Sequence, residues 1–362
     1  PVRFPGDHVV EVATFRGDPD EHVAPPPETA GDRPEGGRRH ASWRHSAENV
    51  FGTPPEDARR RDFTINALFY DPIEDEVIDW VGGLEDIDSG VVRSIGVPQA
   101  RIKEDPVRML RAVHFAERLD FRIEPSLEEA IQHEAATLDD ASQARLYVEL
   151  IKMLSRGRAH GTFRRLYELG VLDVWLPELV AFFDQPVSWP AESGGTHEEA
   201  SRGEPVDAPP AHATWNLLGA ADRWGIAAHK APESLALAVL FGPWLRNAWR
   251  SGPGRRYADG RRGGAVGPFM TFVEELFRPV AVRMSLPRWA ATQMRDVLWM
   301  LDDLREPPPP KQRRRMVRRP GFAVALAFYE LDLISRDGDL GKVDQWRAFA
   351  EEEGVRLSFQ KP

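Results

Sequence analysis

The sequence contains no cysteine. This absence excludes disulfide bonds and thiolate metal sites, and it fits a protein that works in a reducing cytoplasm. The chain also lacks any apolar run of about 18 residues, so no membrane-spanning helix is predicted. Residues 1–17 are of mixed composition and do not resemble a signal peptide. We therefore expect a cytoplasmic protein with no membrane partner.

Positive charge is not in excess either. The 47 Lys and Arg residues are outnumbered by 57 Asp and Glu residues, which gives a formal net charge of −10. Such a balance argues against a protein that coats nucleic acid over its whole surface, but a local basic groove stays open. The 362 residues, 42% of them hydrophobic, are enough for two or three domains with their own cores.

Strand patterns are confined to the first hundred residues. Alternating apolar residues predict strands over 9–15, 76–81 and 91–95. Residues 17–47 are rich in Gly, Pro and charge, which predicts a mobile loop. A helix is predicted over 55–70 with Thr53 as its N-cap, and a turn over 86–90.

From residue 98 onward only helical periodicity remains. A second Pro- and Gly-rich stretch, 184–213, interrupts it. The predicted helices cover 104–119, 126–136, 142–156, 161–170, 214–227, 233–250, 267–280, 286–304, 321–335 and 339–353. The expected fold class is therefore α+β, with a small mixed β region followed by an all-α region.

Two polar clusters stand out. In the first, 59–68, three arginines precede the carboxylate of Asp62, the hydroxyl of Thr64 and the carboxamide of Asn66. Together these groups are suited to a phosphorylated, hydroxyl-rich ligand. A solvated helix face would have the same composition.

The second cluster contains Asp105 and Arg108, which share one face if the segment is helical. A carboxylate only accepts hydrogen bonds and a guanidinium only donates them. That pair complements the donor–acceptor edges of adenine and cytosine, whereas guanine and uracil would leave both groups mispaired, at about 1–3 kcal/mol for a buried group. An ordinary surface ion pair is the alternative.

The segments RRDFTINALFYDP (60–72) and RIKEDPVRMLRAVHFA (101–116) resemble the class II nucleotidyltransferase family, which contains bacterial poly(A) polymerases and CCA-adding tRNA nucleotidyltransferases. The resemblance is strongest over 8–180. It implies a partial nucleotidyltransferase β-sheet head over 1–97 that includes the loop 17–47, and a helical neck that binds RNA and nucleotide over 98–180. A flexible insertion over 181–213 and an RNA-binding helical body over 214–362 would follow.

This resemblance implies template-independent RNA 3′-end adenylation. An RNA 3′-hydroxyl would attack the α-phosphate of ATP and release pyrophosphate, in mRNA polyadenylation and decay. The motif EVATFRG (11–17) and the helices around Trp346 favour a poly(A) polymerase that acts on mRNA or small RNA. The alternatives are a CCA-adding enzyme that acts on tRNA and a non-catalytic RNA- or nucleotide-binding homologue. Mg²⁺ is the implied cofactor and ATP the substrate.

The resemblance also implies roles for single residues. Asp62 and Glu11 would be catalytic carboxylates, although an edge-strand role would explain Glu11 as well. We expect a structural salt bridge between Arg145 and Glu149, which lie four residues apart. The implied nucleotide-binding residues are Arg60, Arg61, Asn66, Asp105, Arg108 and Arg111. The implied RNA-binding residues are Lys311, Arg313, Arg314 and Arg315.

One family feature is missing from the chain. The Gly-Ser turn and the Asp-x-Asp strand that carry the family's metal ligands normally precede the EVATFRG strand, and nothing before residue 9 supplies them. Asp86 and Asp88 follow a Gly-Gly turn and match a different family motif. We therefore predict an N-terminally truncated or degenerate chain that is inactive alone, with Glu11 as a possible metal ligand.

Overall fold

The computed structural model describes residues 2–4, 8–10, 13–16, 51–184, 210–254 and 266–357. The predicted loop 17–47, Glu11 and most of the predicted insertion 181–213 lie outside these residues. The chain divides into two compact units. The first unit is Pro1–Glu104 with Leu119–Ala130, and the second unit is Asp105–Arg118 with Ile131–Pro362.

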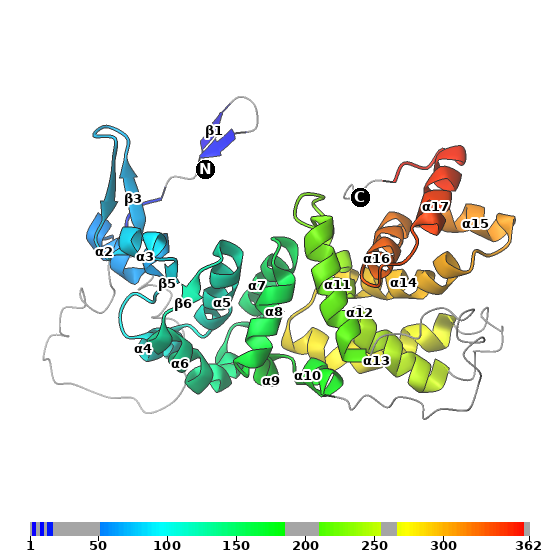
Figure 1. The fold of residues 1–362 in the computed structure, drawn as a ribbon, viewed down its shortest axis with the longest axis horizontal. Coiled ribbons are helices and arrows are strands. Elements are labelled where there is room, and N and C mark those ends of the chain that lie inside the picture. The colour runs from blue at the N-terminus through cyan, green and yellow to red at the C-terminus, as the bar shows by residue number, and fades with distance from the viewer. Residues whose placement is uncertain are drawn as a thin grey trace, which may run out of the picture. The chain divides into compact units, whose positions relative to one another are not determined.

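The described strands of the first unit form three two-stranded sheets. β1 (Val2–Phe4) and β2 (His8–Val10) are antiparallel, as are β3 (Leu68–Asp71) and β4 (Glu76–Asp79), which form a hairpin (Figure 1). β5 (Val91–Val92) runs parallel to β6 (Arg122–Ile123). The prediction of β structure near the N-terminus is confirmed by β2, β4 and β5, although each of these strands is shorter than predicted.

The helix predicted over 55–70 is wrong in its second half. α2 (Pro54–Arg60) ends where Arg61 turns extended, and Phe63 forms an antiparallel bridge with Ser94. A single 3₁₀ turn, η1 (Thr64–Asn66), follows before β3. Burial of Phe63 and this pairing to residues some thirty positions away override the local helical preference.

Three short helices complete the first unit. The predicted turn over 86–90 is wrong for residues 86–88, which belong to α3 (Gly83–Asp88), and is confirmed for Ser89 and Gly90. α4 (Pro98–Glu104) and the start of α6 (Pro125–Glu134) are the others. A small core forms beneath the hairpin, where Phe69, Trp80 and Val81 pack on the buried side chains of Ala58, Ala67 and Ile95.

The described part of the second unit is helical, as predicted. Its N-terminal half contains α5 (Val107–Leu119, whose last residue belongs to the first unit), the 3₁₀ segment η2 (Ala135–Asp140), α7 (Gln143–Ser155), α8 (Ala159–Glu168), α9 (Val171–Trp175) and α10 (Pro177–Phe183). Its C-terminal half contains α11 (Pro210–Trp224), α12 (Glu233–Ser251), α13 (Val266–Arg283), α14 (Arg288–Arg305), α15 (Pro310–Val317), α16 (Phe322–Ile334) and α17 (Gly341–Glu352).

The core of the C-terminal half is built on two apolar helices. α12 and α16 are buried along most of their length, and both pack against α11 and α14. The ends of the predicted insertion are helical, since α10 reaches Phe183 and α11 begins at Pro210. The basic run after Pro310 forms α15, which the periodicity did not predict. None of the helices in the described ranges is both long and apolar enough to cross a membrane.

Candidate functional site

The first polar cluster is a tight turn with a fixed carboxylate at its centre. Asp62 Oδ1 accepts a hydrogen bond from the backbone N–H of Phe63 at 2.9 Å and another from Asn66 Nδ2 at 3.1 Å. Asp62 and Asn66 are both half-buried. The structure therefore brings two predicted site residues together, and Asn66 sets the orientation of the Asp62 carboxylate.

The two predicted arginines of this turn differ in their surroundings. Arg61 is held within the protein: it pairs with Asp57 at 3.2 Å, donates to the carbonyl of Asn66 at 2.6 Å and lies 4.7 Å from the Phe69 ring centre. The Nη1 atom of Arg60 is buried and has no hydrogen-bond partner within the described ranges. Because a buried unpaired donor is costly, Arg60 is suited to an anionic ligand group.

An arginine that sequence reasoning did not single out supports this turn. Arg101 on α4 donates from Nη2 to the backbone carbonyls of Arg60 at 2.7 Å and Arg61 at 2.9 Å, and pairs with Glu104 at 2.6 Å. These carbonyls end α2, where a cation is favoured by the helix dipole. Arg101 lies in the RIKEDP motif. Its contacts are with residues some forty positions earlier in the chain, so the local sequence pattern does not predict them.

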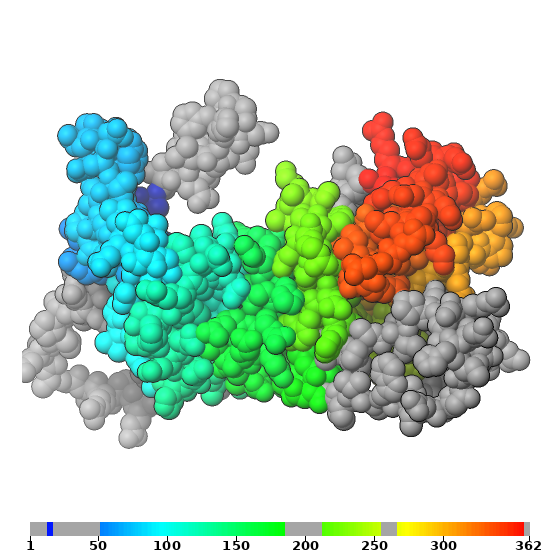
Figure 2. Space-filling model, viewed as in Figure 1, coloured from blue at the N-terminus to red at the C-terminus, as the bar shows by residue number. Residues whose placement is uncertain are grey.

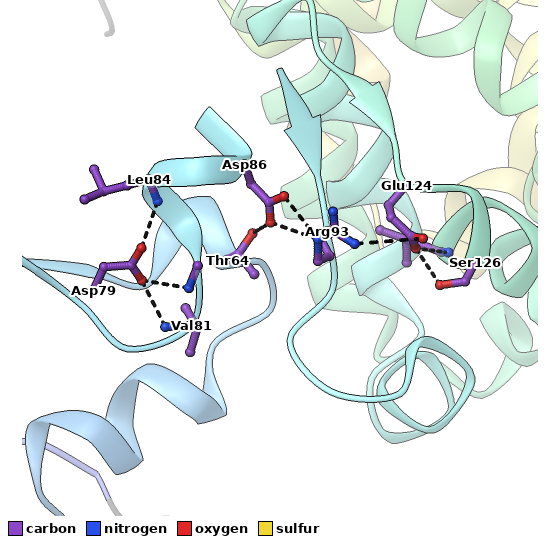
Figure 3. Close-up of polar contacts among 10 residues, drawn as sticks. Thr64, Asp79, Val81, Leu84, Asp86, Arg93, Glu124 and Ser126 are labelled. Atoms are coloured by element: carbon purple, nitrogen blue, oxygen red, sulfur yellow. Dashed lines mark hydrogen bonds and ion pairs between the residues drawn. The ribbon is translucent and has the colours of Figure 1, made fainter. Parts of the chain in front are cut away.

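A buried acid connects the turn to α3 and β5, as Figure 3 shows. Asp86 is 4% exposed and accepts from Thr64 Oγ1 at 2.6 Å and from Arg93 Nε at 3.1 Å. Arg93 also lies 4.0 Å from Glu124, at the start of α6. The hydrogen bond from the Thr64 side chain to Asp86 therefore fixes Thr64 to α3. The position of the turn that contains Asp62 depends on α3 for this reason.

Asp79 in turn fixes the start of α3 (Figure 3). Its carboxylate accepts the backbone N–H groups of Val81 at 2.9 Å, Gly82 at 3.0 Å and Leu84 at 2.9 Å. Burial alone would raise the pKa of Asp79, but these backbone donors outweigh it and hold the pKa below its usual value. The charged carboxylate is thus the form that organises the helix start.

Gly83 allows α3 to pack closely on the turn. A Cβ atom at this position would lie 2.3 Å from the carbonyl oxygen of Thr64 and 3.0 Å from its carbon. Both are backbone atoms, so Gly83→Ala is expected to lower the free energy of unfolding by about 1–3 kcal/mol. Gly267→Ala is the matched control, because nothing lies within 4 Å of its added Cβ. Thermal unfolding of both variants checks the prediction, and equal midpoints would contradict it.

The second cluster lies in the second unit, and its central pair is not the predicted one. Asp105 receives two hydrogen bonds from Arg145 on α7, Nη1 to Oδ1 at 2.9 Å and Nη2 to Oδ2 at 2.6 Å. Asp105 precedes α5 rather than lying within it, and the backbone N–H of Arg108 donates to its carbonyl at 3.1 Å. The expected bridge between Arg145 and Glu149 is wrong, because Arg145 pairs across to Asp105 instead.

Glu149 holds a second predicted residue. Its buried carboxylate lies 3.6 Å from Arg111 on α5 and 2.7 Å from Lys152. The Arg111 guanidinium also lies 5.3 Å from the ring centre of Phe115. Two α7 residues one turn apart therefore fix the side chains of Asp105 and Arg111.

His114 on α5 is a buried group with a pH consequence. Neither ring nitrogen has a hydrogen-bond partner in the part of the chain that is described. Burial, helped by the nearby Arg118, lowers the pKa of His114 from 6.5 to about 4.

The folded state therefore keeps His114 neutral while the unfolded chain takes up a proton. The contribution of neutral His114 to the free energy of unfolding is fully present above pH 6.5. It is lost as the pH falls from 6.5 towards 4. His114→Gln is expected to flatten that part of the pH profile of the free energy of unfolding. Urea titrations at several pH values check it, and equal slopes for variant and parent would contradict it.

The predicted RNA-binding arginines lie on α15, and some have intramolecular partners. Arg314 pairs with Glu353 at 2.8 Å, and Arg313 lies 5.4 Å from the ring centre of Phe349. Lys311 and Arg315 are exposed and have no ion-pair partner among the residues described.

A magnesium site cannot be assembled from the described residues. They contain no group of three His, Asp or Glu residues placed to hold a metal ion. Asp62 is a single carboxylate that accepts hydrogen bonds from Phe63 and Asn66, and Glu11 lies outside the described ranges. The residues that are described therefore do not fit the ion without further ligands.

Two family models match parts of the chain, and several known proteins are similar to it. Residues 3–93 match a model described as "Poly A polymerase head domain", and residues 120–183 match "Probable RNA and SrmB-binding site of polymerase A". Poly(A) polymerase I of Escherichia coli O6:H1 is 40% identical over 187 residues, which is 52% of this chain and 38% of that protein. Poly(A) polymerase I of Salmonella typhi is 30% identical over 346 residues, or 95% of this chain and 67% of that protein.

A solved structure supports the α+β fold. The Bacillus stearothermophilus CCA-adding enzyme in complex with CTP has a TM-score of 0.50 at 22% identity, over 84% of this chain and 61% of that chain. The sequence resemblance and the expected fold class are thereby confirmed. The chain belongs to the nucleotidyltransferase family that contains bacterial poly(A) polymerase I and the CCA-adding enzymes.

Proposed function

We propose that the protein transfers AMP from ATP to an RNA 3′-hydroxyl without a template. The observation that carries the proposal is the Asp62 turn, where a carboxylate oriented by Asn66 lies two residues from a guanidinium with a buried unpaired donor. This combination is suited to a nucleotide triphosphate, because it offers a donor for phosphate oxygens and an acceptor for a hydroxyl proton.

In the reaction we propose, the RNA 3′-oxygen forms a bond to the α-phosphorus of ATP. The bond from that phosphorus to the oxygen that bridges the α- and β-phosphates breaks, pyrophosphate leaves with the electron pair of that bond, and the hydroxyl proton passes to the Asp62 carboxylate. Arg60 would bind phosphate oxygens, Arg61 would brace the turn, and Asn66 would hold Asp62 beside the reacting hydroxyl. The family resemblance implies Mg²⁺ to offset the charge of the phosphates, with ligands in addition to the residues of the Asp62 turn.

Nucleotide choice is proposed to depend on Asp105 and Arg108, with Arg111 on the phosphates. Two hydrogen bonds from Arg145 fix the plane of the Asp105 carboxylate. The orientation of this carboxylate is therefore set before the base of a nucleotide binds. Arg108 is half-buried one turn along at the start of α5. A fixed acceptor beside a donor favours the edges of adenine and cytosine.

Poly(A) synthesis on mRNA or small RNA is the form of the activity that we favour, since Poly(A) polymerase I of Salmonella typhi matches 95% of the chain. CCA addition to tRNA is the second candidate, supported by the likeness to a CCA-adding enzyme. In both, the basic residues Lys311, Arg313, Arg314 and Arg315 would contact RNA phosphates.

Transfer of label from α-phosphate-labelled ATP to a short RNA primer tests the reaction class. The natural gene product is expected to label a primer with a free 3′-hydroxyl and to release one pyrophosphate for each AMP added. A primer that ends in a 3′-deoxynucleotide is the control and should stay unlabelled. Binding of ATP and RNA without transfer would instead support a non-catalytic homologue.

A further inference from the structure

One face of α15 is a stripe of cations. Lys311, Arg314 and Arg315 lie on α15, and Arg318 directly follows it. Arg314 and Arg315 are adjacent, the other successive pairs are three residues apart, and all four side chains are exposed. The opposite face is anchored by the buried side chains of Met316 and Val317. Like charges three and four residues apart destabilise a helix, so this stripe is not explained by the stability of α15.

A carboxylate from a segment outside α15 contacts two of these cations. Glu353 directly follows α17, and α15 and α17 lie next to one another at the surface (Figures 1 and 2). Its Oε1 accepts from Arg314 Nε at 2.8 Å, and its Oε2 accepts from Arg318 Nη2 at 3.1 Å. The Glu353 side chain is 15% exposed, whereas those of Arg314 and Arg318 are 65% and 63% exposed.

The position of Glu353 is unfavourable in itself. A negative side chain at the C-terminal end of a helix opposes the helix dipole. The two arginines offset that cost, and one carboxylate bridges both of them. Each guanidinium has five N–H donors, and only one donor of each meets Glu353. The remaining donors lie on highly exposed side chains, where a second anion can approach.

We propose that Arg314 and Arg318 form a binding site for the phosphate backbone of single-stranded RNA, and that Glu353 is an intramolecular competitor that weakens it. In the free protein Glu353 occupies the place of one phosphate. RNA binds against that negative charge, so the affinity for RNA is lower than the four cations alone would give. This inference rests on the proposed function, because it takes RNA as the ligand. It adds that Glu353 limits the affinity for RNA.

A set of charge-neutral substitutions in the natural gene product tests the competitor. Glu353→Gln is expected to tighten binding of a labelled single-stranded oligoadenylate by roughly 2- to 30-fold, the range for two surface ion pairs. Glu352→Gln is the matched control, since Glu352 is exposed on the same turn and has no ion pair with these arginines. It should change the affinity less. Equal gains from both variants, or weaker binding by Glu353→Gln, would overturn the proposal.

The double variant R314Q/R318Q tests the phosphate site. Its affinity should be lower, and the slope of log affinity against log salt should fall by about 1.4, for two contacts to single-stranded RNA. Arg278→Gln, an exposed arginine on α13, is the control and should leave the slope nearly unchanged. In the R314Q/R318Q background Glu353→Gln should have no further effect, since coupling needs both partners. A slope equal to that of the parent would contradict the site.

This binding measurement is separable from the proposed reaction. Unchanged RNA binding by R314Q/R318Q, together with normal AMP transfer by the parent, would defeat only the α15 site. Absence of AMP transfer, together with the expected binding changes, would defeat only the proposed reaction.

Discussion

Asp62→Asn is expected to reduce AMP incorporation by about 10²–10⁴-fold, the range for loss of a positioned acid or base. The amide keeps the size of the side chain, and its oxygen still accepts from the N–H of Phe63 and from Asn66. Only the negative charge and the basic oxygen are lost. Binding of RNA and the thermal unfolding midpoint should therefore stay close to those of the parent.

Asp88→Asn is the matched control for this substitution. Asp88 is an exposed acid of α3 in the same unit and has no ion pair among the residues described. Loss of one negative charge there should leave incorporation nearly unchanged. Full activity of Asp62→Asn, or an equal loss in both variants, would remove Asp62 from the catalytic role.

The second large effect is expected on nucleotide choice. Asp105→Asn replaces one acceptor oxygen with a donor, so the fixed edge that we propose for adenine or cytosine is lost. Discrimination of ATP against GTP is expected to fall by roughly 5- to 150-fold, which corresponds to about 1–3 kcal/mol for a mispaired buried group. Single-nucleotide incorporation with ATP and with GTP measures the ratio.

Arg145→Gln tests whether the orientation of Asp105 matters. Loss of the two hydrogen bonds from Arg145 frees the Asp105 carboxylate, so the same discrimination should fall, while the carboxylate itself remains. Arg164→Gln is the control, because it breaks an exposed ion pair with Glu168 at 3.2 Å on α8. Unchanged discrimination in Asp105→Asn and Arg145→Gln would make their pair a purely structural salt bridge.

Much of the helical region could be predicted from the sequence because its apolar spacing is local. α7, α12 and α14 begin and end within two residues of the predicted bounds. The structure of the region around Asp62 could not be predicted from the sequence, because it depends on residues far along the chain. Phe63 pairs with Ser94 and Thr64 bonds to Asp86, and neither contact leaves a trace in the local pattern.

The candidate site shows the same limit. The family resemblance implies that Asp62 and Asn66 belong to one site, and the hydrogen bond between their side chains fits that expectation. Spacing along a helix does not predict which side chains form ion pairs. Arg145 lies one turn from Glu149, yet it pairs with Asp105, whose two carboxylate oxygens match the guanidinium fork.

Product length on two primers tests the central claim most directly. The natural gene product is incubated with ATP alone, or with ATP and CTP, on a short unstructured RNA and on a tRNA that ends in CC. Our account predicts long adenylate ladders on the unstructured RNA and no incorporation of CTP. Addition that stops after one A on the tRNA, with no extension of the unstructured RNA, would contradict poly(A) synthesis.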